Sequence, residues 1–119
     1  MKTIIVADDD AMFRMIMQRH LGALGFRVIE ETSGKDVVAQ IGQYQPVACL
    51  IDLIMEEKEG IETITEVAQL PRRPKVIAVS SNAFYLGMAV DLGADATLQK
   101  PIALETLKAT LDRLAIRPD

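Results

Sequence analysis

The sequence contains very little cysteine, which excludes a framework of disulfide bonds. Cys49 is the only cysteine among 119 residues, so no intramolecular disulfide can form. It stands inside the apolar run 47–51, where a buried and inert thiol is expected. This usage fits a protein of the reducing cytoplasm.

Long hydrophobic runs are missing as well. No apolar run approaches the roughly 18 residues that a membrane-spanning helix needs. Only five residues separate Met1 and Lys2 from the three aspartates at 8–10, which leaves no room for the apolar core of a signal peptide. We therefore expect neither a signal peptide nor a membrane segment.

The chain also lacks an excess of positive charge. It has 13 Lys and Arg against 17 Asp and Glu, a net charge of −4, and its basic residues are scattered along the sequence. Binding to nucleic acid needs basic side chains clustered on one face, so no direct contact with nucleic acid is expected. With half of its residues hydrophobic, the chain is predicted to fold as one domain, residues 1–119.

Short apolar runs alternate with segments of helical period along the whole chain. The runs that predict strands lie near residues 2–7, 26–31, 47–52, 75–79 and 95–99. Most are continuously apolar, which is typical of strands buried on both faces. The sequence therefore predicts an α/β fold with a doubly wound, five-stranded parallel sheet and helices on both faces, joined by right-handed crossovers.

Each of the five segments that follow a strand carries an apolar stripe at the spacing of an amphipathic helix. The stripes are Phe13, Ile16, Met17, Leu21 and Leu24; Val37, Val38 and Ile41; Ile61, Ile64, Val67 and Ala68; Tyr85, Met88, Ala89 and Leu92; and Leu104, Leu107, Leu111 and Leu114. Gly25 and Gly93 are predicted to end the first and fourth helices, and Ser33 with Asp36 resembles a capping box for the second. The leucines of the last helix are expected to pack on the sheet, although their spacing also allows a homodimer.

Charged residues follow three of the predicted strands. Asp8 and Asp9 follow the first, Asp52 ends the third, and Lys100 follows the fifth. Ligands bind at the carboxyl ends of strands in open parallel sheets, so these groups are predicted to form a pocket for a cation and a phosphate. The alternatives are a solvated helix start for the aspartates at 8–10, a turn role for Asp52, and a helix cap for Ser80 at the end of the fourth strand.

Four separated motifs carry a resemblance to a known family. They are the segments 5–10 with Arg14, 50–55 with Gly60, 76–81, and 93–95 leading to Lys100–Pro101. On these motifs the chain resembles, over nearly its whole length, the receiver domains of bacterial two-component response regulators, of the chemotaxis-regulator type. The resemblance implies a flavodoxin-like strand order, 2-1-3-4-5.

The resemblance also implies a magnesium site. Asp9 and Asp52 would supply carboxylate ligands, Asp8 would hold metal-bound water, and the backbone carbonyl of Ile54 would fill a further position. Mg²⁺ prefers oxygen ligands of this kind, and the metal would relieve the repulsion between the crowded carboxylates.

In the same family pattern Asp52 is the phosphoacceptor. Its carboxylate would receive a phosphoryl group from a sensor histidine kinase or a histidine phosphotransfer protein, while Lys100 and Ser80 contact the phosphoryl oxygens. A cis Lys100–Pro101 bond would aim the lysine into the pocket. The protein would be no enzyme in the usual sense, since it would catalyse only its own phosphorylation and dephosphorylation. The acyl phosphate would change its conformation and so control a target protein or an output domain.

The chain departs from the family pattern in three respects, which involve four residues. Glu56 stands where a proline is usual, and Thr97 replaces an aromatic residue that switches between two positions. Ile54 and Asn82 flank the expected route of the hydrolytic water, and an apolar Ile54 is predicted to slow dephosphorylation.

The sequence also allows other functions. A degenerate receiver that binds a partner without phosphorylation is the main alternative, motivated by Glu56 and Thr97. An aspartate-nucleophile phosphatase of the haloacid dehalogenase type would use a first-strand Asp-x-Asp, but Met12 stands where that family has Thr or Val. Met12 and Met15 are also candidates for a soft docking patch on the first helix.

Overall fold

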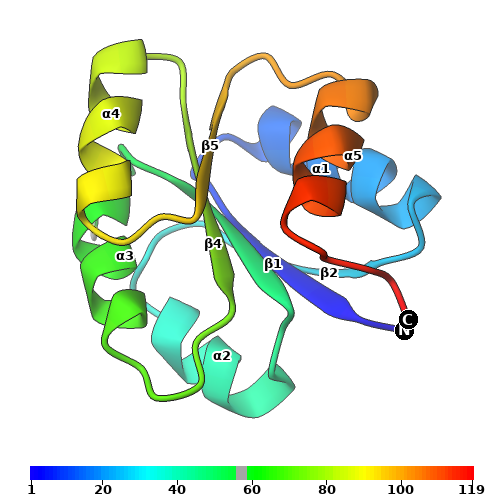
Figure 1. Ribbon diagram of the computed structural model, residues 1–119, viewed down its shortest axis with the longest axis horizontal. Helices are drawn as coiled ribbons and strands as arrows, with labels where there is room; N and C mark the ends of the chain where they lie inside the picture. Colours follow the sequence, from blue (N-terminus) through cyan, green and yellow to red (C-terminus); the bar gives the residue numbers. More distant parts are fainter. Residues whose placement is uncertain (56–58) are drawn as a thin grey trace.

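The computed structural model describes residues 1–55 and 59–119, and within these ranges five strands alternate with five helices (Figure 1). In chain order the elements are β1 (Thr3–Ala7), α1 (Ala11–Ala23), β2 (Arg27–Glu31), α2 (Val37–Tyr44), β3 (Ala48–Asp52), α3 (Gly60–Ala68), β4 (Lys75–Ser80), α4 (Ala83–Asp91), β5 (Ala96–Gln99) and α5 (Leu104–Arg113). Each strand lies within one residue of its predicted bounds at either end.

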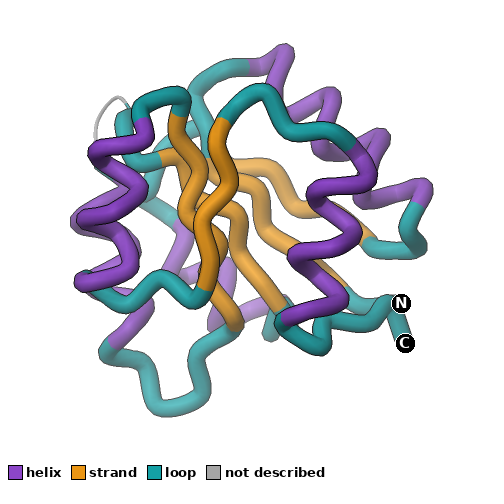
Figure 2. Tube along the Cα trace, turned by 45° about the horizontal axis from the view of Figure 1, so that its top comes forward, coloured by secondary structure: helices purple, strands orange, loops and turns teal. Residues whose placement is uncertain are grey.

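All strand pairs are parallel, and the sheet has the order β2-β1-β3-β4-β5. The predicted strand order is therefore confirmed. β1 and β3 lie side by side at the centre, with Ile51 of β3 paired to Ala7 of β1 and to Ala78 of β4. Figure 2 shows the twisted sheet between its two layers of helices.

The helices cover both faces of the sheet (Figure 1). One core contains buried residues of α1 and α5, including Met17 and Leu107, and the opposite core contains residues of α2, α3 and α4, including Val37 and Ile64. This is the predicted doubly wound architecture. Leu107 and Leu111 are buried in the first core, so their predicted packing on the sheet is confirmed.

Two of the predicted apolar stripes are confirmed except at one residue each, Met88 in α4 and Ile16 in α1. In α4 the buried residues are Leu86 and Ala89, while Met88 is 40% exposed; this helix is apolar on nearly every side, so its period does not indicate which side faces the sheet. In α1 the core side holds Phe13, Met17 and Leu21, and Ile16 is exposed.

The glycine predictions are confirmed, and the capping box is not. Gly25 and Gly93 follow α1 and α4 with φ of 96° and 117°, a backbone conformation that favours glycine. Ser33 lies too far from the start of α2 to cap it: its Oγ accepts a hydrogen bond from Lys35 N at 3.1 Å in the preceding turn. Asp36 occupies the cap position but makes no side-chain capping bond.

Among the described residues, no helix combines the length and the apolar character that crossing a membrane requires.

Candidate functional site

The carboxyl edge of the sheet brings the predicted site residues together. Asp8 follows β1, Asp52 ends β3, Ser80 ends β4 and Lys100 follows β5, and these four strands are neighbours in the sheet. Parallel strands end at the same edge, so residues that are up to 92 positions apart meet there.

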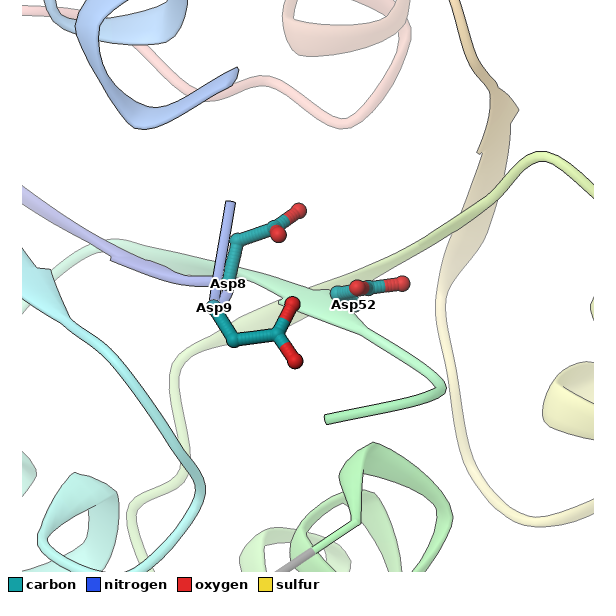
Figure 3. Close-up of side chains that lie close together, drawn as sticks. All are labelled: Asp8, Asp9 and Asp52. Carbon is teal, nitrogen blue, oxygen red and sulfur yellow. The ribbon is translucent and has the colours of Figure 1, made fainter. Parts of the chain in front are cut away.

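Three carboxylates form the acidic centre of the site (Figure 3). Asp8, Asp9 and Asp52 each offer an oxygen, and these oxygens all lie within 4.8 Å of one another. Asp8 and Asp52 are buried, whereas Asp9 is exposed at the mouth of the site. Oxygen ligands in this arrangement suit a hard divalent cation such as Mg²⁺.

The Asp8 carboxylate is completely buried and only partly satisfied. Its Oδ1 accepts a hydrogen bond from Asp10 N at 2.9 Å. Its Oδ2 lies 2.7 Å from Lys100 Nζ in an ion pair but accepts no well-directed hydrogen bond from the described residues. Lys100 compensates only one of the negative charges here, because the carboxylates of Asp9 and Asp52 converge on the same place. The donor set therefore fits a bound metal ion.

Lys100 links the acidic residues. Its Nζ lies 2.7 Å from Asp8 Oδ2, 3.7 Å from Asp52 Oδ2 and 4.3 Å from the centre of the Phe13 ring. Its backbone N–H donates to the carbonyl of Ser80 at 3.0 Å, and its peptide bond to Pro101 is cis. The ammonium group is thus held over an aromatic face and between two carboxylates.

The Asp52 carboxyl has a perturbed pKa. Burial is the main cause and the negative charge of Asp8 adds to it, while Lys100 opposes both; together they raise the pKa of Asp52 to about 6. The Ile54 N–H donates to Asp52 Oδ1 at 3.5 Å and also favours the ionised form. A cation beside Asp52 would stabilise the carboxylate at neutral pH.

Ser80 is buried beside this centre and does not cap α4. Its Oγ accepts a hydrogen bond from Asn82 N at 3.0 Å. The cap is Asn82, whose Oδ1 accepts from Phe84 N at 2.9 Å. The alternative interpretation of Ser80 as a helix cap was therefore wrong. Because the Ser80 oxygen is used as an acceptor, its hydroxyl hydrogen remains available for donation.

Two supporting side chains were given no role in the site from the sequence, although Arg14 was noted as part of a motif. Phe13 was assigned only to the core, although the Lys100 ammonium group also lies over its ring in a cation–π contact. Arg14 donates through a terminal guanidinium nitrogen to the carbonyl of Asp8 at 2.7 Å and pairs with Glu30 at 3.0 Å, which ties β1 and β2 to the start of α1. Their positions three and four residues after Asp10, on the first turn of a helix, were the available signal.

Gly60 allows the backbone of α3 to approach the site closely. A Cβ at this position would lie 1.9 Å from the carbonyl oxygen of Asp52 and 2.8 Å from Leu53 Cα. The Gly60 N–H also donates to the Leu53 carbonyl at 3.1 Å. No residue with a side chain fits here without moving the backbone that carries Asp52.

The structure describes two of the three residues Ile54, Thr97 and Glu56, at which the chain departs from the family pattern. The Ile54 side chain is 52% exposed beside the site, and Thr97 is half-buried on β5. Glu56 lies outside the described residues. The two methionines proposed as a docking patch, Met12 and Met15, are both exposed on α1.

Comparison with known proteins identifies the class. The family model of the response regulator receiver domain matches residues 4–112, and the chain therefore belongs to this family of two-component signalling proteins. The predicted resemblance is confirmed.

Individual relatives agree with this assignment. The chain is 32% identical over 112 residues to the transcriptional regulatory protein ZraR of Salmonella typhimurium, covering 92% of this chain and 25% of ZraR. It is 25% identical over 118 residues to the chemotaxis protein CheY of Thermotoga maritima, covering 96% and 98% of the two chains. The chain spans only 12% to 25% of the length of the first curated relatives it matches, which include a sensor histidine kinase of Escherichia coli.

A solved structure shares the fold and carries a metal. It is the receiver domain of a sensor histidine kinase from Pseudomonas aeruginosa, with a TM-score of 0.86, 23% identity, and coverage of 94% of this chain and 95% of that chain. That receiver was solved with a magnesium ion coordinated in its active-site cleft.

Proposed function

We propose that this receiver accepts a phosphoryl group on Asp52 from a histidine kinase or a histidine phosphotransfer protein. The observation that carries the proposal is the placement of Asp52 between two further carboxylates, Asp8 and Asp9, and the half-buried Lys100 at one end of the sheet. An Asp52 carboxylate oxygen would attack phosphorus as the bond to the donor histidine nitrogen breaks, forming an acyl phosphate and returning the electron pair to the imidazole.

Mg²⁺ is the proposed cofactor, held by Asp8, Asp9, Asp52 and the backbone carbonyl of Ile54. When bound, it would neutralise charge on the phosphoryl oxygens. The three converging carboxylates, whose charge Lys100 offsets only in part, support this assignment. The solved Pseudomonas receiver with magnesium gives independent support from the same fold.

Lys100 and Ser80 are proposed to hold the phosphoryl group. Lys100 lies between two carboxylates and can turn one of its three donors to a phosphoryl oxygen. The Ser80 hydroxyl already accepts from Asn82 N, so its hydrogen can be donated to the same group. These two donors would stabilise the acyl phosphate and couple its charge to the loops after β4 and β5.

The consequence of phosphorylation is proposed to be a change in binding to a target protein or an output domain. Thr97 lacks the ring of the usual switch residue, so we assign the change mainly to Ser80 and the loop that follows it. Dephosphorylation catalysed by the domain itself, the single domain of residues 1–119, a homodimer through α5, no direct contact with nucleic acid and a cytoplasmic location stay predictions of the sequence.

The test is intact-mass spectrometry after incubation with acetyl phosphate and Mg²⁺. We expect a single-phosphate adduct in the parent protein, and none with EDTA or in Asp52→Asn. Asp36→Asn is the matched control, because Asp36 is exposed and its side chain makes no capping bond. This control should be phosphorylated like the parent.

The outcomes separate the two candidate functions. An adduct that persists in Asp52→Asn would assign the phosphoryl group to another residue. A folded parent protein that forms no adduct under any condition would favour the receiver that binds its partner without phosphorylation. Circular dichroism of each variant shows whether the fold is intact.

A further inference from the structure

A hollow lies at the opposite edge of the sheet from the acidic cluster. It has a volume of about 450 Å³ and is formed by the start of β1, the loops before β3 and β4, and the segment after α5. In Figures 1 and 2 the two chain ends lie side by side at this edge. Its lining residues are Lys2, Pro46, Val47, Arg73, Pro74, Lys75, Leu114, Ala115, Ile116, Arg117 and Asp119.

The charge of this hollow is opposite to that of the whole chain. Four of its lining residues are basic and one is acidic, although the chain carries a net charge of −4. Basic residues that are scattered in the sequence are brought together because β1 and β4 begin at the same edge and the chain returns there after α5. The molecule therefore has an acidic site at one end of its strands and a basic hollow at the other.

Two of the four basic groups already form ion pairs. Arg73 forms two hydrogen bonds of 3.0 Å with the Asp95 carboxylate, and Arg117 lies 3.5 Å from Asp112. Lys2 and Lys75 are exposed, and neither forms an ion pair within the described part of the chain, although the charge of Lys75 also acts on the Asp95 carboxylate. These two ammonium groups outnumber Asp119, the one acidic residue of the lining, and can contact an anionic ligand, while the ion pair with Asp95 holds Arg73 in the wall.

The walls are held by backbone hydrogen bonds, so the hollow does not need a ligand to form. Lys75 N donates to the Val47 carbonyl at 3.2 Å, and Lys2 N donates to the Pro118 carbonyl at 3.1 Å. The apolar part of the lining includes Pro74 and Ile116, which are buried. A partly apolar hollow with cationic groups at its rim can hold a small organic anion through charge-assisted contacts and apolar packing.

We propose that this hollow binds a phosphate-bearing small molecule of about the size of a mononucleotide. Lys2 and Lys75 would contact the phosphate groups, and the organic part would lie on the apolar lining. The volume falls within the range of about 300–1,000 Å³ that is typical of small-molecule sites. This role is separate from phosphorylation at Asp52, because the two sites lie at opposite ends of the strands.

The experiment is an NMR titration of the ¹⁵N-labelled protein in EDTA, with ATP, inorganic pyrophosphate and uncharged adenosine as separate probes. We expect ATP and pyrophosphate to cause saturable shifts of the amides of Val47 and Ala115, with no comparable shift at Asp52. ATP should bind more tightly than pyrophosphate, and adenosine should bind most weakly. Raising the salt concentration should weaken the binding of both anions.

A pair of double variants with equal charge tests the assignment. Lys2→Ala/Lys75→Ala should raise the dissociation constant for ATP at least about tenfold, because two charge-assisted contacts are lost. Arg19→Ala/Lys35→Ala removes the same charge from exposed positions outside the hollow and should leave the constant within about twofold. Both substitutions in the hollow keep the backbone bonds of its walls, and a dispersed spectrum confirms that the variant is folded.

Several results would overturn the proposal. These are no saturable shift with either anion, shifts only around Asp52, an equal loss of affinity in the two double variants, or adenosine binding as tightly as ATP. Shifts of the Val47 and Ala115 amides by a hexaglutamate peptide but not by ATP or pyrophosphate would assign the hollow to an acidic peptide instead.

Discussion

Replacing Gly60 with alanine should destabilise the protein, although the same change stabilises most helices. Gly60 is the first residue of α3, and a Cβ there would lie 1.9 Å from the Asp52 carbonyl oxygen and 2.7 Å from the carbonyl carbon. The opposing atoms are backbone atoms of a buried strand end, so no side chain can rotate away. To reach an ordinary contact of 3.4 Å, the two segments must separate by about 1.5 Å (3.4 minus 1.9).

The expected magnitude follows from two opposing effects. Overpacking of this kind costs about 1–3 kcal/mol, and the rigid backbone places Gly60→Ala near the upper end. Alanine recovers about 0.5–1 kcal/mol of helix propensity at most. We therefore expect Gly60→Ala to lower the free energy of unfolding by about 2 kcal/mol. Because the backbone of Asp52 must move, the yield of phosphorylated protein should fall as well.

Two other helical glycines provide matched controls. A Cβ at Gly42 in α2 or at Gly87 in α4 would meet nothing within 4 Å, and neither residue has a positive φ. Gly42→Ala and Gly87→Ala should each raise the free energy of unfolding by about 0.5–1 kcal/mol. Urea denaturation of the three variants with a common m-value measures these changes. If Gly60→Ala were as stable as the two controls, the close approach of α3 to Asp52 would be refuted.

Four further predictions concern single groups. Burial raises the pKa of the Cys49 thiol to about 12, so a thiol reagent at pH 8 should label the protein only when urea unfolds it; rapid labelling of the folded protein would contradict its burial. Partial burial disfavours the charge of Asp95, but its hydrogen bonds to Arg73 and to the backbone outweigh this effect and lower the pKa of Asp95. The Arg73–Asp95 pair should therefore contribute its full stability above the unfolded-state pKa of about 3.9, and this contribution should be lost as the pH falls through the folded-state pKa. Asp95→Asn should consequently destabilise the protein more at pH 7 than at pH 3. An equal loss of stability at both pH values would contradict the prediction. In EDTA, the pKa of Asp52 is raised to about 6, so the folded state binds this proton more tightly than the unfolded state does. The free energy of unfolding of the parent protein should therefore decrease as the pH rises from about 4 to 6. The decrease should be smaller in Asp52→Asn. Once phosphorylation is established, Ile54→Asn should speed dephosphorylation by admitting water beside Asp52, and an unchanged half-life of the acyl phosphate would argue against this role.

The meeting of the candidate site residues could be predicted from the sequence because these residues stand at strand ends. Asp8, Asp52 and Lys100 each come next to a short apolar run, and parallel strands oblige such positions to meet at one edge. The prediction depended on topology rather than on the conformation of individual side chains. Errors about which helix residues face the sheet therefore did not affect this prediction.

The incorrect predictions have physical causes of two kinds. In α4, apolar residues occur on nearly every side, and only contact with the sheet selects Leu86 and Ala89 for burial. At Ser33 the spacing of a capping box was present, but the helix begins four residues later, at Val37. A local pattern was ambiguous in the first case and was overridden by the start of the helix in the second.

The amino-acid sequence by itself determined the alternation of strands and helices, the burial of the strands and the charged groups at their carboxyl ends. These features depend on short-range periodicity and on the common direction of parallel strands. Only the tertiary structure decided that Lys100 lies over Phe13, that α3 touches the Asp52 backbone at Gly60, and that scattered basic residues surround one hollow. Such contacts join segments that are distant in the sequence, so their distances depend on how the whole chain packs, which no local pattern records.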